Sequence, residues 1–96
     1  MTKADIVKNI SDQTGVDKTD VQMIAEKFMD EIKGSLQNNN NVYLRGFGSF
    51  IIKTRAEKTG RNISKNTAVI IPAHNIPSFK PSKTFVKSVK QNVPIS

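Results

Sequence analysis

Residues 46–50 of the chain read Gly46-Phe47-Gly48-Ser49-Phe50 and place two aromatic rings around a tight turn. β-rich runs flank the turn at residues 42–45 and 49–53, and a short glycine-containing connection between such runs is typical of a β-hairpin. A third ring, Phe79, follows later in the chain. One small domain cannot cover this much ring surface, and exposed aromatic surface ordinarily marks an interface. We therefore expect Phe47, Phe50 and Phe79 to form the shared core of a dimer, with a base-stacking platform as the alternative.

Two helical patterns precede this turn, in residues 1–41. The first begins with a capping box at Thr2 and Asp5 and ends at Gly15. The second begins at Asp17, ends at the asparagine run 38–41, and carries one apolar stripe: Val21, Ile24, Ala25, Phe28, Ile32 and Leu36. Because this second helix also holds three lysines and four acids between Lys18 and Leu36, a DNA major groove would repel it. Residues 1–41 are therefore interpreted as a helical scaffold and not as a helix-turn-helix reader.

Downstream of the turn, residues 54–74 become polar and basic before β character returns at residues 68–71. This pattern predicts a β-hairpin that projects roughly 25 Å from the body, at about 3.3 Å per residue, and that is too polar to bury itself. We call residues 54–74 the arm. Residues 42–53 and 75–81 are expected to form the body sheet. Residues 82–91 are expected to form a last helix with Phe85, Val86 and Val89 facing inward, and residues 92–96 a flexible tail.

The 96 residues allow one small domain with a thin core, so residues 1–96 are taken as a single unit. The net charge is +7, but it is divided unevenly: residues 1–41 hold five Lys and seven acids, whereas residues 42–96 hold ten Lys or Arg and only Glu57. The second part therefore carries a net +9 against −2 in the first. Such a division favours a polyanionic partner, with nucleic acid ahead of an anionic membrane surface.

Several classes of function are disfavoured. The chain has no Cys and no long apolar run, so we expect an intracellular, cytoplasmic protein without membrane contact. His74 is the only imidazole and is interpreted as a surface residue at a strand end. Without clustered catalytic or metal-ligating groups, we expect no enzyme activity, no metal, no cofactor and no small-molecule substrate.

The arm and the strand that leads into it carry regularly spaced cations, several of which can face the same way along a two-stranded ribbon. Phosphate groups are the natural target of such a ribbon, because a projecting hairpin of this length has no stability rationale alone. The cations are Lys53, Arg55, Lys58, Arg61 and Lys65.

From Met1 to about Gln91 the chain resembles the bacterial histone-like HU and integration host factor proteins. The motifs that carry the resemblance are Gly46-Phe47-Gly48-Ser49-Phe50, Arg55-Ala56, Thr59-Gly60-Arg61-Asn62 and Ile76-Pro77-Ser78-Phe79-Lys80. The resemblance implies an α+β fold in an intertwined dimer, in which a helical base lies under a β-sheet and each subunit extends one β-arm. It also implies that the arms reach around duplex DNA through the minor groove, as is known for this architectural family.

The resemblance also implies individual DNA contacts, position by position. These are Arg55, Lys58, Arg61 and Asn62 on the arm, Lys80 and Lys83 on the body, and Lys3 as a weaker candidate. One departure concerns the arm tip, where Ile63 stands in place of the family's usual kink-inducing proline. Isoleucine can also act as a wedge between base pairs, although it lacks the fixed φ of proline. The simpler alternative is that Ile63 only caps the tip.

The function expected from these observations is bending and compaction of duplex DNA in the nucleoid, with little sequence specificity. Two alternatives stay open, namely a sequence-selective subunit like integration host factor, and an RNA-binding protein. The sequence does not distinguish a homodimer from a heterodimer.

Overall fold

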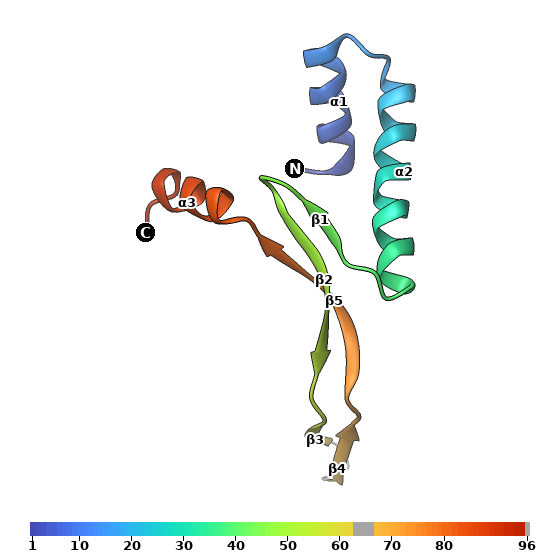
Figure 1. The fold of residues 1–96 in the computed structure, drawn as a ribbon, viewed down its shortest axis with the longest axis vertical. Helices are drawn as coiled ribbons and strands as arrows, with labels where there is room; N and C mark the ends of the chain where they lie inside the picture. Colours follow the sequence, from blue (N-terminus) through green and yellow to red (C-terminus); the bar gives the residue numbers. More distant parts are fainter. Residues whose placement is uncertain (63–66, 96) are drawn as a thin grey trace.

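The computed structural model describes residues 1–62 and 67–95 and shows an α+β chain with a long projection (Figure 1). β1, β2 and β5 form an antiparallel three-stranded sheet in the order β1-β2-β5, and β3 pairs with β4 in a second, two-stranded ladder. The expected fold class is confirmed. In chain order the elements are α1 (Lys3–Thr14), α2 (Lys18–Gln37), β1 (Val42–Leu44), β2 (Gly48–Arg55), β3 (Lys58–Asn62), β4 (Thr67–Ile71), β5 (His74–Pro81) and α3 (Lys83–Asn92).

The ends of α1 follow directly from local sequence. The Asp5 backbone N–H donates to the Thr2 hydroxyl at 3.3 Å, and the Thr2 N–H donates to the Asp5 carboxylate at 2.9 Å, which completes the expected capping box. Gly15 ends the helix in the left-handed region with φ of +75°. Asp17 precedes α2 as expected, but its side chain makes no capping hydrogen bond.

The geometry of the turn between β1 and β2 requires glycine at two positions. The Phe47 N–H donates to the Leu44 carbonyl oxygen at 3.0 Å, and Gly46 has φ of +81°, which a side chain would disfavour. Gly48 is buried under β5, where an added Cβ would lie 2.6 Å from the Lys80 carbonyl oxygen. The turn therefore requires glycine at position 46 for its backbone angle and at position 48 for close packing.

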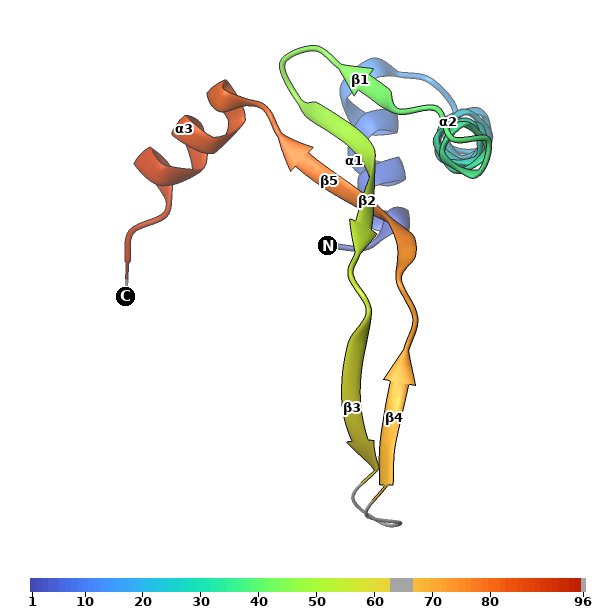
Figure 2. The same cartoon turned by 60° about the horizontal axis from the view of Figure 1, so that its bottom comes forward.

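The projection is divided into two ladders and is not one continuous hairpin. The body sheet reaches as far as the pair Arg55 and His74, and pairing resumes only at Lys58 and Ile71 (Figure 2). Pro72 accounts for the interruption, because proline has no N–H to donate to a ladder. The body sheet therefore extends two residues further along the chain than the expected boundary at residue 53.

The described chain has little core of its own. Among the residues whose burial the structure describes, Val7 and Val21, where α1 packs on α2, are the only buried hydrophobic residues. α3 stands apart from α1 and α2 in both views (Figures 1 and 2). The radius of gyration is 19.0 Å, whereas a compact domain of this length has about 12–13 Å. None of the described helices is long and apolar enough to cross a membrane.

Candidate nucleic-acid interface

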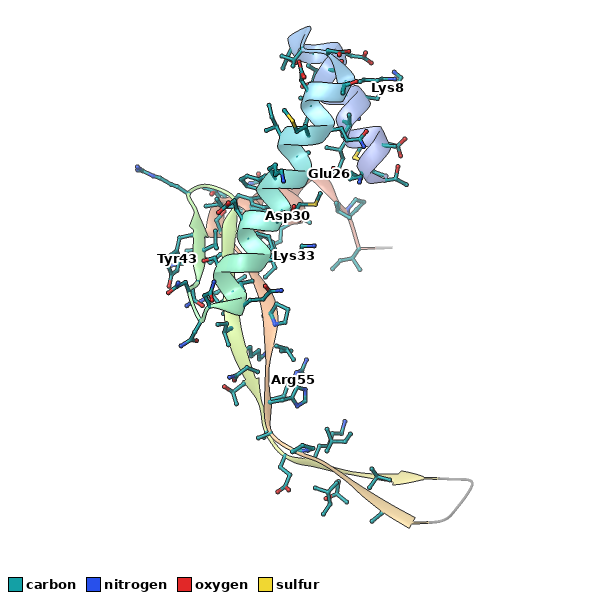
Figure 3. The ribbon with its side chains drawn as sticks, turned by 90° about the vertical axis from the view of Figure 1, so that its right-hand side faces the viewer. Lys8, Glu26, Asp30, Lys33, Tyr43 and Arg55 are labelled. Atoms are coloured by element: carbon teal, nitrogen blue, oxygen red, sulfur yellow. The ribbon has the colours of Figure 1, made fainter. Side chains whose placement is uncertain are left out.

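Strand register gives the three-stranded sheet two chemically different faces. Tyr43 on β1 pairs with Ser49 on β2, and Ser49 pairs with Lys80 on β5, so the three side chains form a row on one face. Since side chains alternate along a strand, Lys53 and Arg55 project from this same face. Figure 3 shows Arg55 where the sheet passes into the arm and Tyr43 near the outer edge. We call this the polar face; its residues are Tyr43, Ser49, Ile51, Lys53, Arg55, His74, Ile76, Ser78 and Lys80.

The opposite face is apolar and carries the aromatic rings. The centroid of the Phe79 ring lies 5.0 Å from that of Phe47 and 5.0 Å from that of Phe50. The Phe85 ring of α3 stacks on Phe47, with 5.6 Å between the centroids. The three phenylalanines singled out in the sequence therefore form one cluster, which Phe85 extends. Phe47 is still 46% exposed and Phe79 37%. The apolar residues of this face are Val42, Leu44, Phe50, Ile52, Pro77 and Phe79, and towards the arm the same register adds the hydrogen-bonded pair Thr54 and Asn75.

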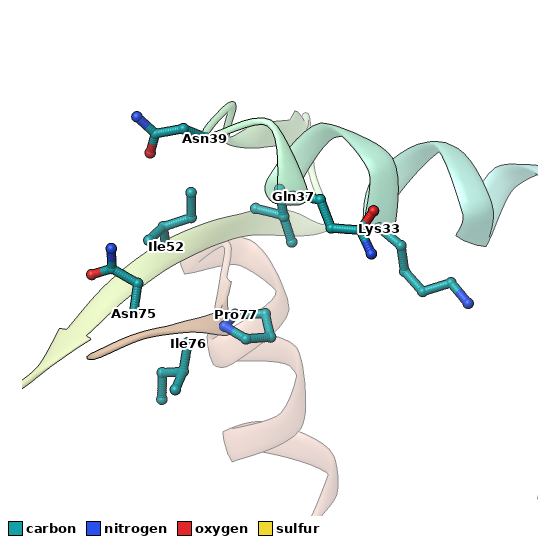
Figure 4. A pocket seen from close by; sticks show the side chains of 8 residues that line it. Lys33, Gln37, Asn39, Ile52, Asn75, Ile76 and Pro77 are labelled. Atoms are coloured by element: carbon teal, nitrogen blue, oxygen red, sulfur yellow. The ribbon is translucent and has the colours of Figure 1, made fainter. Parts of the chain in front are cut away.

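Two further apolar grooves lie uncovered on the single chain. A groove of about 650 Å³ runs between α1 and α2 and is lined by Ile6, Ile10 and Phe28 among others. A second groove of about 610 Å³ lies between the end of α2 and strands β2 and β5 (Figure 4). Ile52 and Pro77 line it from the strands. Both grooves adjoin elements that pack on the apolar side of the sheet.

Charge pairing differs between the two parts of the chain. The ion pairs among the described residues all lie on α1 and α2: Lys3 with Glu26 at 2.7 Å, Lys8 with Asp12 at 2.8 Å, and Lys33 with Asp30 at 3.7 Å. Hydrogen bonding and attraction from Lys3 lower the pKa of Glu26, and Lys8 does the same for Asp12. Within residues 42–60 and 68–95, whose side chains the structure describes, no cation is paired with a carboxylate, so the cations of the polar face are not neutralised by those residues.

The structure brings some of the expected contact residues together and separates others. Lys53, Arg55 and Lys80 share the polar face, Lys58 begins β3 in the arm, and Lys83 begins α3. Lys3 lies on the helical base in its ion pair with Glu26. Of the arm residues, Arg61 and Asn62 belong to β3, while Ile63 and Lys65 lie outside the described residues.

Sequence reasoning did not single out Tyr43 or Arg45. Tyr43 lies between Val42 and Leu44, which project from the apolar face. The alternation of side chains along β1 could have identified Tyr43, because this alternation places Tyr43 on the opposite face from its two apolar neighbours. His74 is the first residue of β5 and is exposed, as expected.

Comparison with known proteins agrees with this arrangement. The model of the family described as "Bacterial DNA-binding protein" matches residues 1–90. The chain is 34% identical over 91 residues to the DNA-binding protein HU of Thermus thermophilus, covering 95% of this chain and 94% of that protein. It is 30% identical over 95 residues to the integration host factor subunit alpha of Alteromonas mediterranea, with 99% and 96% covered.

A solved structure shows the same fold. The HU chain of an Anabaena HU–DNA cocrystal structure superposes with a TM-score of 0.89 at 29% sequence identity, covering 94% of this chain and 98% of that one. The HU of Thermotoga maritima shares the fold as well, with a TM-score of 0.66. With its polar and aromatic sheet faces, its arm and the family match over residues 1–90, the chain belongs to the bacterial DNA-binding protein family of HU and integration host factor.

Proposed function

We propose that this protein is an architectural DNA-binding protein that bends and compacts duplex DNA in the nucleoid without a chemical step. The observation that carries the proposal is the register of the sheet, which puts Lys53, Arg55 and Lys80 on one face leading into the arm. Cations in such a row can follow a phosphate backbone. The cocrystal of the Anabaena relative with DNA supports the same partner for this chain.

The functional unit is proposed to be a dimer. The aromatic cluster and the two apolar grooves lie on the side of the sheet opposite the cations, so a second copy can cover them without covering the DNA-binding surface. Burial of this surface would be favourable at about 25 cal/mol per Å² of apolar area. Two subunits would then present two arms to one duplex. Phe47, Phe50 and Phe79 are the proposed centre of this shared core.

Each arm is proposed to enter the minor groove. Cations neutralise phosphates along its length, and Ile63, which connects β3 to β4 in sequence, unstacks a base step. Unstacking costs a few kcal/mol per step, which the contacts of the bent duplex with the protein offset. The proposed DNA-binding residues are Lys53, Arg55, Lys58, Arg61, Asn62, Ile63, Lys65, Lys80 and Lys83, with Lys3 as a secondary contact.

Low sequence specificity is proposed because the minor groove distinguishes mainly A·T from G·C pairs. A sequence-selective role is the second candidate, since relatives named integration host factor subunit alpha match almost the whole chain. Competition between random duplexes of different sequence separates the two. An affinity for one duplex sequence that is about 10³-fold or more higher than for the others would favour the selective role.

The deciding experiment measures affinity, bending and particle mass together on random, nicked and mismatched duplexes. If roughly six to ten phosphates are engaged, affinity should fall about 10³- to 10⁵-fold between 50 and 200 mM salt. Duplex RNA and single strands serve as competitors. A response to salt that is nearly flat, or a duplex that stays straight when saturated, would contradict the proposal.

A further inference from the structure

His74 is the only histidine of the chain, and it lies at the junction between the body sheet and the arm. It pairs with Arg55 at the last position of the β2–β5 ladder and is exposed. The proposed function gives this side chain no role. An imidazole is nevertheless the one side-chain group that ordinarily changes its charge between about pH 5 and 8, so its place beside the cations has a consequence for binding.

The charged neighbours of His74 come from the strand opposite it and from the break in pairing. Arg55 lies directly across the pair, where the sheet passes into the arm, and Lys53 lies diagonally on the same polar face (Figure 3). The register is the same on both sides of the break, so Glu57 lies opposite Pro72. Neither His74 nor Glu57 forms an ion pair with the residues whose side chains the structure describes. A proton on His74 therefore adds one more positive charge to a row of cations.

The two ring nitrogens of His74 have different surroundings. The Nδ1 atom lies 3.0 Å from the Pro72 carbonyl oxygen. A carbonyl oxygen only accepts, so Nδ1 donates in this bond and carries the proton of the neutral ring. This tautomer leaves Nε2 as the site of protonation, and Nε2 makes no hydrogen bond with the described residues. Protonation therefore converts Nε2 from an acceptor into a donor without breaking the bond that orients the ring.

We propose that His74 makes duplex binding dependent on pH: Nε2 takes up a proton from solvent when DNA binds, and the resulting imidazolium donates to a phosphate beside Arg55. The inference rests on the proposed function and concerns its regulation. A nearby phosphate favours the charged ring over the neutral ring, so His74 titrates at higher pH in the complex than in the free protein. By linkage, the affinity for DNA rises as the pH falls through that interval. A solvent-exposed contact of this kind changes affinity by about 2- to 5-fold.

The unaltered sequence provides a direct probe, because a single histidine gives a single set of ring NMR signals. Protein with ring-¹³C-labelled histidine is titrated over about pH 5 to 8 at constant ionic strength, alone and saturated with random duplex DNA. We expect the midpoint of the ring titration to lie at higher pH in the complex. A midpoint that is unchanged or lower, while anisotropy of labelled DNA reports full binding, would overturn the inference and leave the proposed function intact. Absence of binding at every pH would instead contradict the proposed function, and the inference with it.

Variants separate the proton from the rest of the side chain. Between about pH 7.5 and 5.5 the parent should gain about 2- to 5-fold in affinity for each His74 that contacts a phosphate, whereas His74→Gln should change little. His74→Lys keeps its charge throughout this range and should bind at the higher pH as tightly as the parent does at the lower pH.

The matched control returns an imidazole to the chain away from the arm. It combines His74→Gln with Gln13→His, because Gln13 is exposed on α1, and it should bind as His74→Gln does at both pH values. A parent whose affinity does not depend on pH, or a gain at low pH that persists in His74→Gln, would refute the assignment to His74. A gain that returns with Gln13→His would refute it as well, because it would show that the position of the imidazole does not matter.

Discussion

Of the five glycines, Gly48 has the least room for a side chain. It is buried between Leu44 and Pro81, and a Cβ at this position would lie 2.7 Å from the Phe79 ring as well as 2.6 Å from the Lys80 carbonyl oxygen. A backbone oxygen cannot rotate away as a flexible side chain can. Relief of the clash therefore requires β2 and β5 to separate, which also disturbs the aromatic cluster.

We expect Gly48→Ala to destabilise the protein by about 1–3 kcal/mol, the usual range for overpacking a tight site. Thermal unfolding at fixed protein concentration measures the effect. Gly34→Ala is the control, because an added Cβ there meets nothing within 4 Å and the helix favours alanine over glycine. If Gly48→Ala were as stable as Gly34→Ala, the inference that β2 packs closely on β5 at this position would be wrong.

The pair Lys3 and Glu26 gives a pH dependence of known sign. Lys3 lowers the pKa of Glu26 below its ordinary value of 4.5, so the folded chain holds this carboxylate ionised more strongly than the unfolded chain does. The stabilisation is therefore present above about pH 4.5 and is lost as the pH falls through the lowered pKa. It is small, because both side chains are well exposed to solvent.

A carboxyl ¹³C NMR titration tests this pair directly. Lys3→Gln should raise the pKa of Glu26 toward 4.5 and leave the pKa of Asp12 low, because Asp12 depends on Lys8. In the parent protein, added salt should raise the pKa of both carboxyls toward their ordinary values, because it screens the attraction from the lysines. A Glu26 pKa that does not respond to Lys3→Gln would show that the ion pair is not formed in solution.

At the scale of elements, the sequence predicted those features that depend on nearby residues. The capping box of α1 and the glycine-containing turn between β1 and β2 both involve residues within three or four positions of one another. The arm was correctly expected to project, but its division at Pro72 was missed because β character continues on both sides of it. The stacking of Phe85 on Phe47 joins α3 to a distant turn, which no local pattern specifies.

The arm also carries the proposed wedge, which can be tested separately from phosphate binding. Ile63→Ala shortens the apolar side chain without changing the charge, so it should preserve most of the affinity and reduce DNA bending. Ring-closure efficiency of short duplexes measures the bend, and anisotropy measures the affinity. Ile95→Ala is the control, because it removes the same atoms from a fully exposed isoleucine after α3. Equal bending by the parent and Ile63→Ala would refute the wedge and leave phosphate binding unaffected.

At the scale of the whole molecule, the single chain exposes more surface than a closed domain would. Its accessible area is 8332 Å², whereas a compact monomer of 10.7 kDa exposes about 5,500 Å². The extended arm contributes part of the excess. The rest includes large apolar side chains on every helix, such as Phe28 on α2 and Val89 on α3. The sequence predicted uncovered ring surface at Phe47, Phe50 and Phe79 but not on the helices, because periodicity marks which helix residues are apolar and not which chain covers them.

If a second copy covers this surface, the aromatic cluster should control both association and stability. Phe47 contacts Phe79 and Phe85, so Phe47→Ala removes the ring that links the sheet to α3 and should cost about 3–5 kcal/mol once that ring is buried in a dimer. Sedimentation should then show the dimer dissociating at concentrations where the parent remains associated, and the melting temperature should depend more steeply on concentration. Met23→Ala is the control, since Met23 is exposed among charged residues on the outer side of α2. Two results would exclude this cluster as the shared core: a parent protein that sediments as a monomer, or a Phe47→Ala variant that associates as firmly as Met23→Ala. The exposed apolar faces would then have to be covered in another way.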